Sequence, residues 1–77
     1  MNTHEITIKK RPMQQHLGGS QDIVFYTRNK ALSRFFEMTD ELGYEVEVTY
    51  KNNLVTYEAG GRGHDHRIEL KLTNVLV

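Results

Sequence analysis

The sequence predicts a small α+β domain, in which one amphipathic helix packs on one face of a mostly antiparallel sheet. Three observations favour this fold class. Five short segments have the apolar patterns of strands, one segment changes to helical periodicity, and glycine or asparagine pairs separate the last three segments. The 77 residues are expected to form a single domain, residues 1–77, with the element order ββαβββ.

The N-terminal part predicts two strands joined by a long loop. Ile6 and Ile8 alternate with polar residues within residues 4–10, as in a strand with one buried face. Residues 11–21 hold the only proline and a Gly-Gly pair, and they predict a loop. The continuous β-branched and aromatic run of residues 22–27 predicts a strand that is buried on both sides.

A helix is predicted from Arg28 to Leu42. Its apolar stripe consists of residues at helical spacing, namely Leu32, Phe35, Phe36, Thr39 and Leu42, with Ala31 and Met38 at the edge. Thr27 or Asn29 is the expected N-cap, and Gly43 stands where a C′ glycine is expected.

The last third predicts a three-stranded meander formed by residues 44–51, 54–59 and 64–73. A two-residue turn at Asn52-Asn53 gives the pairs Tyr50–Val55, Val48–Tyr57 and Val46–Ala59. A four-residue loop over residues 60–63 gives the pairs Tyr57–His66 and Val55–Ile68. These pairs place apolar residues of three strands on one face, which we expect the helix to cover.

Charge is balanced over the chain but not along it. Residues 1–34 hold six basic side chains against Glu5 and Asp22, a net charge of +4, whereas residues 35–77 have a net charge of −4. There is no apolar run long enough to span a membrane and no N-terminal signal pattern, so we expect a soluble, cytoplasmic protein without a membrane partner. The absence of cysteine excludes disulfides and thiolate metal sites.

The segment AGGRGHDHRIEL contains two candidate features. His64 and His66 occupy alternate positions of a predicted strand and point to the same side, which is a known metal-ligand arrangement. No third ligand is evident, so two histidines that cap the core are the other interpretation. Arg62 lies between glycines at the expected hairpin tip, either as a solubilising charge or as an arginine that enters an acidic pocket of a partner.

The outward face of the meander is a candidate protein-binding surface. Glu47 is expected to lie opposite Glu58, and Arg67 or Lys71 can neutralise this pair of like charges. The alternative is an acidic surface that attracts a basic partner. The candidate protein-binding residues are therefore Arg62, Glu47, Glu58, Arg67 and Glu69.

The basic N-terminal half is a candidate nucleic-acid surface. The first half of the predicted helix is basic and the second half is acidic, which is the reverse of what the helix dipole favours. Either tertiary ion pairs offset this cost, or the basic helix N-terminus binds an anion such as phosphate. The candidate nucleic-acid-binding residues are Lys9, Lys10, Arg11, Tyr26, Arg28, Lys30 and Arg34.

The sequence contains no recognisable nucleophile pattern and no phosphate-binding loop, so no enzyme activity, catalytic residue or cofactor is expected. It favours a small protein-binding module, for example an inhibitor or accessory protein of the kind that phages and mobile elements carry, acting on a larger protein. A nucleic-acid-binding protein is the alternative, and a metal-binding module at His64 and His66 is a more distant one. A homodimer could form through an edge strand or through the apolar residues 75–77.

Overall fold

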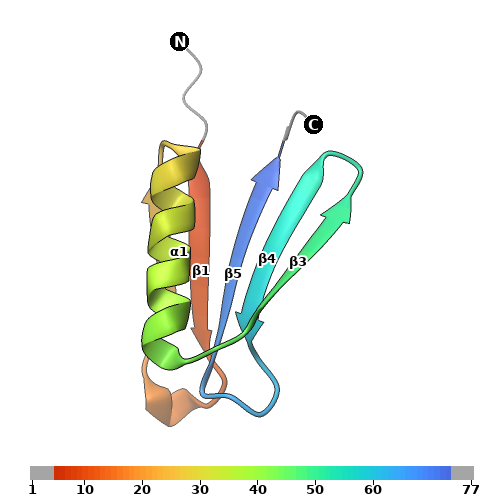
Figure 1. Ribbon diagram of the computed structural model, residues 1–77. Helices are drawn as coiled ribbons and strands as arrows, with labels where there is room; N and C mark the ends of the chain where they lie inside the picture. Colours follow the sequence, from red (N-terminus) through yellow and green to blue (C-terminus); the bar gives the residue numbers. More distant parts are fainter. Residues whose placement is uncertain (1–4, 74–77) are drawn as a thin grey trace.

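The computed structural model describes residues 5–73 and contains one five-stranded sheet and one long helix (Figure 1). The elements are β1 (Ile6–Pro12), a 3₁₀ helix η1 (Gln15–Leu17), β2 (Gln21–Phe25), α1 (Arg28–Leu42), β3 (Val46–Lys51), β4 (Leu54–Gly60) and β5 (His66–Thr73). The strand order is β2-β1-β5-β4-β3, and every neighbouring pair is antiparallel. The predicted α+β class and the ββαβββ order are confirmed.

Both ends of α1 are capped as predicted. The Thr27 side chain accepts a hydrogen bond from the backbone N–H of Lys30 at 3.4 Å, so Thr27 rather than Asn29 is the N-cap. Gly43 adopts a left-handed conformation with φ of 69°. The N–H of Gly43 donates to the carbonyl of Asp40, and the N–H of Tyr44 donates to that of Thr39. This pattern is the Schellman motif, which ends a helix without leaving its last carbonyls unpaired.

The register of the meander is confirmed for one hairpin and corrected for the other. Strands β3 and β4 pair as expected, including Tyr50–Val55, Val48–Tyr57 and Val46–Ala59. Strands β4 and β5 instead pair Tyr57 with Leu70 and Val55 with Leu72. The predicted partners were wrong because Gly60 belongs to β4 and pairs with Arg67, and the connection before β5 consists of residues 61–65. Since the shift from His66 to Leu70 is an even number of residues, the same side chains still face the helix.

Two expectations for the N-terminal strands are wrong. Strand β1 continues through Arg11 and Pro12, which were assigned to the loop, and Pro12 pairs with His66 at the strand end. A proline is accepted there because the end of a strand needs no further N–H donor from that residue. Strand β2 is not buried on both sides: it is an edge strand, and Val24 is 45% exposed on the face away from the helix.

The core lies between α1 and the middle of the sheet. It is built from the buried apolar residues Ile8, Ala31, Phe35, Met38, Val55, Ala59, Ile68, Leu70 and Leu72. On the helix, the buried stripe runs through Ala31, Phe35, Met38 and Thr39, whereas Phe36 and Leu42 of the predicted stripe are exposed. The helix is therefore rotated about its axis relative to the expected orientation, and Phe36 is left facing β4.

Candidate functional site

The helix covers only one half of the sheet. Its main contacts are with β1, β2 and β5, and Figure 1 shows β4 and β3 extending away from it. The expectation that the helix covers the apolar face of the meander holds for β5 and for the core residues Val55 and Ala59 of β4, and it is wrong for β3. An α-helix is about 10–12 Å wide, whereas the outer axes of five strands lie about 19 Å apart at the usual spacing. One helix cannot cover both halves.

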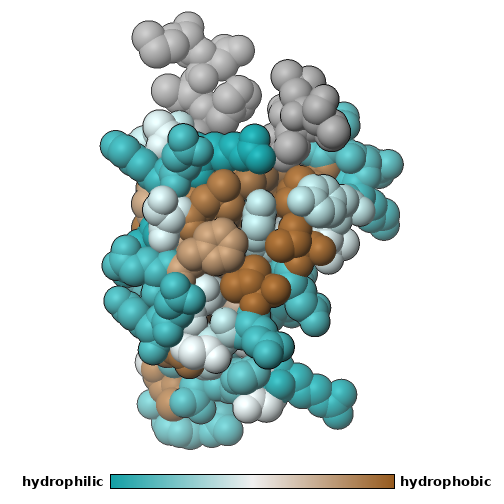
Figure 2. Space-filling model, viewed as in Figure 1, coloured by the Kyte–Doolittle hydropathy of each residue, from teal (hydrophilic) through white to brown (hydrophobic). Residues whose placement is uncertain are grey.

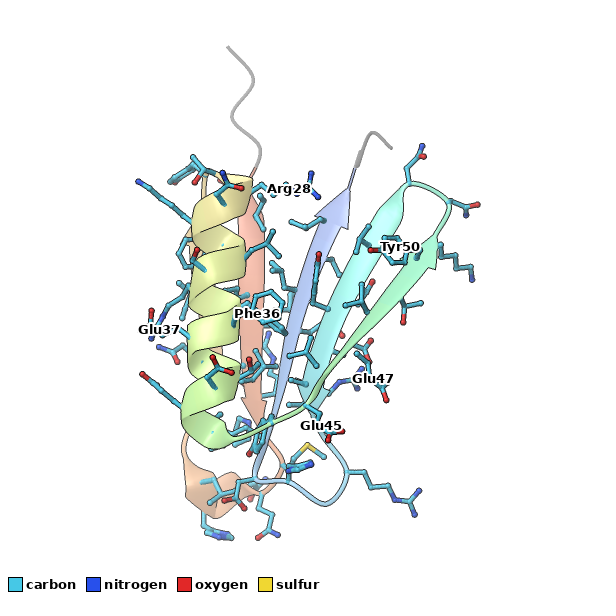
Figure 3. The ribbon with its side chains drawn as sticks, in the orientation of Figure 1. Arg28, Phe36, Glu37, Glu45, Glu47 and Tyr50 are labelled. Carbon is cyan, nitrogen blue, oxygen red and sulfur yellow. The ribbon has the colours of Figure 1, made fainter. Side chains whose placement is uncertain are left out.

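The uncovered half carries an apolar strip, which we define as Phe36, Val46, Val48, Tyr50 and Tyr57; Val46 and Tyr57 are partly buried and the other three are exposed. Tyr50 is 74% exposed, Val48 is 42% exposed and Phe36 is 41% exposed. The rings of Phe36 and Tyr57 are in edge-to-face contact at 6.0 Å, which joins the helix to the sheet part of the strip. Figure 2 shows apolar side chains gathered between the helix and strands β3 and β4, and Figure 3 shows Phe36 and Tyr50 on either side of this region.

Strand β3 is the edge of the sheet next to the apolar strip. Within residues 5–73 it pairs with β4 along one side only, and no described residue pairs with the backbone N–H and C=O groups of its other side. Exposed edges are usually protected by bulges, prolines or charged side chains. The charged side chains of β3 are Glu47 and Lys51, and neither has an ion-pair partner within residues 5–73.

The face of the sheet away from the helix carries a row of charges. The row crosses all five strands in the order Glu47, Glu58, Glu69, Lys9 and Asp22. The expected opposition of Glu47 and Glu58 is present. Cations on β5 neutralise two of the three glutamates: Arg67 lies 3.6 Å from Glu58 and 3.4 Å from Glu69, and Lys71 lies 3.3 Å from Glu69.

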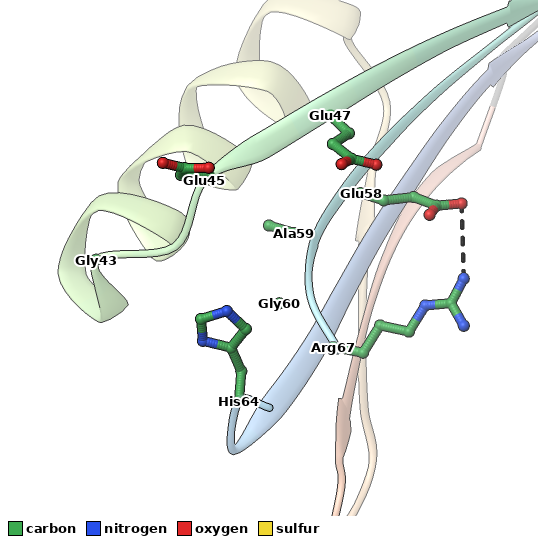
Figure 4. A pocket seen from close by; sticks show the side chains of 8 residues that line it. All are labelled: Gly43, Glu45, Glu47, Glu58, Ala59, Gly60, His64 and Arg67. Atoms are coloured by element: carbon green, nitrogen blue, oxygen red, sulfur yellow. Dashed lines mark ion pairs between the residues drawn. The ribbon is translucent and has the colours of Figure 1, made fainter. Parts of the chain in front are cut away.

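A pocket of about 370 Å³ lies where the charged row meets the connection after β4. Figure 4 shows the glutamates around it, with the Arg67 guanidinium turned toward Glu58. Its lining is Gly43, Glu45, Glu47, Glu58, Ala59, Gly60, His64 and Arg67. Three carboxylates against one guanidinium make this pocket suitable for a cationic side chain of a partner.

The two histidines are arranged differently from the expectation. His64 lies in the connection before β5 and not in a strand, so the alternation that would align it with His66 does not apply. The His64 ring packs against the Tyr44 ring at 4.5 Å, and the Nδ1 atom of His66 is buried without a hydrogen-bond partner. Within residues 5–73, no group of three or more His, Asp or Glu side chains is placed to hold a metal ion.

Arg62 is exposed at the tip of this same connection, as expected. It lies between Gly61 and Gly63, both of which have φ of 88°. No ion pair involving Arg62 is present in the described part of the chain. Its guanidinium is therefore free to reach a partner.

The basic residues of the N-terminal half do not form one patch. Lys9 and Arg11 lie on the sheet face opposite the helix, and Lys10 alternates to the helix side. Arg11 is paired with Asp22 at 2.6 Å, and Arg34 is paired with Glu37 at 2.8 Å. The remaining candidate nucleic-acid-binding residues, Tyr26, Arg28 and Lys30, lie around the start of α1. Tyr26 is 64% exposed, and Arg28 and Lys30 are exposed on the first turn (Figure 3 labels Arg28).

The apolar strip and the edge position of β3 were missed in the sequence. A usable signal was present: five predicted strands and one helix leave part of an apolar sheet face without a cover.

Comparison with protein families, with curated proteins and with solved structures finds no match to this chain. The helix of the described region, Arg28–Leu42, is too short and too polar to cross a bilayer. The apolar residues 75–77, considered for dimer formation, lie outside the described residues.

Proposed function

We propose that this protein is a protein-binding module of the inhibitor or accessory type, and that it holds a larger partner on the apolar strip. The exposure of Tyr50, Val48 and Phe36 on one uncovered sheet face carries the proposal. Contiguous apolar surface on a small domain marks a site of association. Tyrosine at such a site supplies much of the binding free energy because it buries a large ring and loses few rotamers.

The charges beside the strip favour a partner with basic groups. Glu45, Glu47 and Glu58 line the pocket on one side of β3 and β4, and the strip lies on the other. A partner that reaches both faces past the Gly43 end of β3 would bury apolar side chains on Tyr50 and Val48 and place a cation in the pocket. Such charges raise the association rate and select the partner more than they raise affinity.

The test is capture of a partner by immobilised protein from a lysate of the cells that produce it. Capture is repeated after nuclease treatment and at high salt, and also with Tyr50→Ser and Val48→Ser. Tyr26→Ser is the matched control, because Tyr26 is also a largely exposed tyrosine but lies outside the apolar strip. We expect one stoichiometric protein that survives nuclease and salt, is lost with Tyr50→Ser or Val48→Ser, and is retained with Tyr26→Ser.

Two results would contradict the proposal. Recovery that disappears with nuclease, and with Arg28→Glu or Lys30→Glu, would indicate the nucleic-acid alternative, whose binding falls steeply with salt. Capture that is indifferent to the strip variants but lost with Glu58→Lys or Arg62→Ala would place the binding surface on the charged face and turn instead.

A further inference from the structure

The unpaired side of β3 has a pattern that is complementary to itself. A two-residue turn is closed by a hydrogen-bonded pair, here Lys51 with Leu54, and hydrogen-bonded pairs alternate along an antiparallel ladder. The backbone groups of Val46, Val48 and Tyr50 therefore point away from β4. A further strand would have to bond to these residues.

We infer that a second copy of this chain occupies this edge, with β3 antiparallel to its equivalent and Thr49 opposite Thr49. In this register Val48 lies opposite Tyr50 of the second copy, and both are residues whose backbone groups point outward. Glu47 then lies opposite Lys51 of the second copy, on the face away from the helix. The two-fold symmetry repeats each of these pairs, so the dimer has two Glu47–Lys51 ion pairs.

Charge complementarity selects this register among those that the backbone allows. A shift that places Glu47 opposite Glu47 brings like charges together, which destabilises a strand pair. A shift that places Val48 opposite Val48 pairs Lys51 with Glu45, which directly precedes the strand, but it leaves Glu47 facing the uncharged Thr49. With Thr49 at the centre, both charged residues of β3 are paired. Within one chain they are four residues apart on the same strand and cannot reach each other.

The inference goes beyond the proposed function and does not depend on it, but the dimer would change the surface that a larger partner meets. Edge pairing about an axis perpendicular to the sheet makes one continuous sheet with both helices on the same face. The two apolar strips then lie side by side between the helices, so each copy supplies half of the surface that we propose for the larger partner. Figure 1 shows that β3 is the edge farthest from α1, so the helix does not obstruct the approach of a second β3.

Sedimentation equilibrium of the purified full chain, up to about 1 mM, measures this association. We expect a dimer whose dissociation constant rises about tenfold or more in Glu47→Lys and in Lys51→Glu, because each replaces two attractions with two repulsions. A 1:1 mixture of these two variants restores opposite charges at both positions, so it is expected to dimerise again. Val48→Pro removes an outward N–H and is expected to abolish the dimer while β3–β4 pairing remains. Circular dichroism checks that each variant is folded.

A wild-type chain that stays monomeric over this range would overturn the inference, as would a dimer that neither charge variant weakens, or a mixture that does not recover. The chain could instead be a monomer that loses its larger partner in both Tyr50→Ser and Val48→Pro. That result would show that an extended segment of the partner pairs with the β3 edge. In that case the inference fails and the proposed function stands. A dimer that captures no protein partner would support the inference and contradict the proposed function.

Discussion

The hydroxyl oxygen of Tyr44 accepts a hydrogen bond from the backbone N–H of His66 at 3.2 Å. Tyr44 follows the glycine that ends α1, and His66 begins β5, so this bond joins the end of the helix to the start of the central strand. The Tyr44 ring also covers Gly60 and packs on His64. One side chain thereby fixes the connection that borders the acidic pocket.

Removing that hydroxyl is expected to lower the free energy of unfolding. Tyr44→Phe keeps the ring but leaves the His66 N–H without its acceptor, at a cost of about 1 kcal/mol. Urea unfolding followed by circular dichroism measures the change. Tyr50→Phe is the control, since no hydrogen bond of the Tyr50 hydroxyl is present among the described residues. Equal effects of the two variants would show that the bond to His66 contributes nothing.

Gly60→Ala is expected to destabilise the fold far more than Gly63→Ala. Both glycines have positive φ, 80° and 88°, so each alanine is strained by about 1–2 kcal/mol. At Gly60 the added Cβ would also overlap the carbonyl oxygen of His66 and lie 2.9 Å from the Tyr44 ring, whereas nothing lies within 4 Å at Gly63. Overpacking adds about 1–3 kcal/mol at Gly60 alone. Thermal unfolding of the two variants isolates this contact, and similar melting temperatures would contradict it.

The Arg11–Asp22 pair is expected to make stability depend on pH in the acid range. A hydrogen bond from Arg11 at 2.6 Å, with charge attraction from Arg11 and Lys9, lowers the pKa of Asp22 from its ordinary value of 3.8. A carboxyl whose pKa is lower in the folded state stabilises the fold above its unfolded pKa. That stabilisation is lost as the pH falls through the folded pKa.

Asp22→Asn tests this dependence. The difference in unfolding free energy between wild type and variant should be present at about pH 7 and should disappear below the lowered pKa of Asp22. Asp65→Asn is the control, because Asp65 is an exposed carboxylate without an ion pair in the described chain. A difference that is constant from neutral to acid pH would contradict the role of the charge.

The reversed charges of α1 are expected to make Glu41→Lys stabilising. The first turn has no acidic residue and the last turn has no basic residue. Placing a cation in the last turn is worth about 0.5–1 kcal/mol through the helix dipole, which corresponds to a rise in Tm of roughly 2–8 °C for a domain of this size. Glu5→Lys makes the same change in net charge beside the start of α1, since Ile6 pairs with Phe25, and there the dipole does not favour a cation, so Tm should not rise. A matching rise in both variants would assign the effect to net charge.

The features predicted correctly from the sequence are those set by neighbouring residues. Thr27 and Gly43 mark the helix ends through local hydrogen bonds, and the Asn52-Asn53 turn fixes the β3–β4 register over two residues. The β4–β5 register was wrong because its connection contains several glycines. Nothing in the pattern shows that Gly60 continues the strand while residues 61–65 form the connection.

The candidate site depended on information that periodicity does not contain. Alternation places Val48 and Tyr50 on the apolar face, but it does not say which strands the helix covers. That is decided by the order β2-β1-β5-β4-β3, which brings the N-terminal hairpin under α1 and leaves β3 at the edge. The Glu47–Glu58 opposition was predictable because it follows from one short turn.

The central position of β5 has a consequence for how the chain folds during synthesis. Strands β1 and β4 each pair with β5 and not with each other, although β5 is the last strand of the described chain to leave the ribosome. Until β5 emerges, the β1–β2 hairpin with α1 and the β3–β4 hairpin are separate segments, each with an exposed apolar face. The core residues Ile68, Leu70 and Leu72 of β5 then join them in one late step. Assembly of the whole sheet therefore waits for residues 66–73, and a chain interrupted before residue 66 would be a substrate for chaperones and proteases.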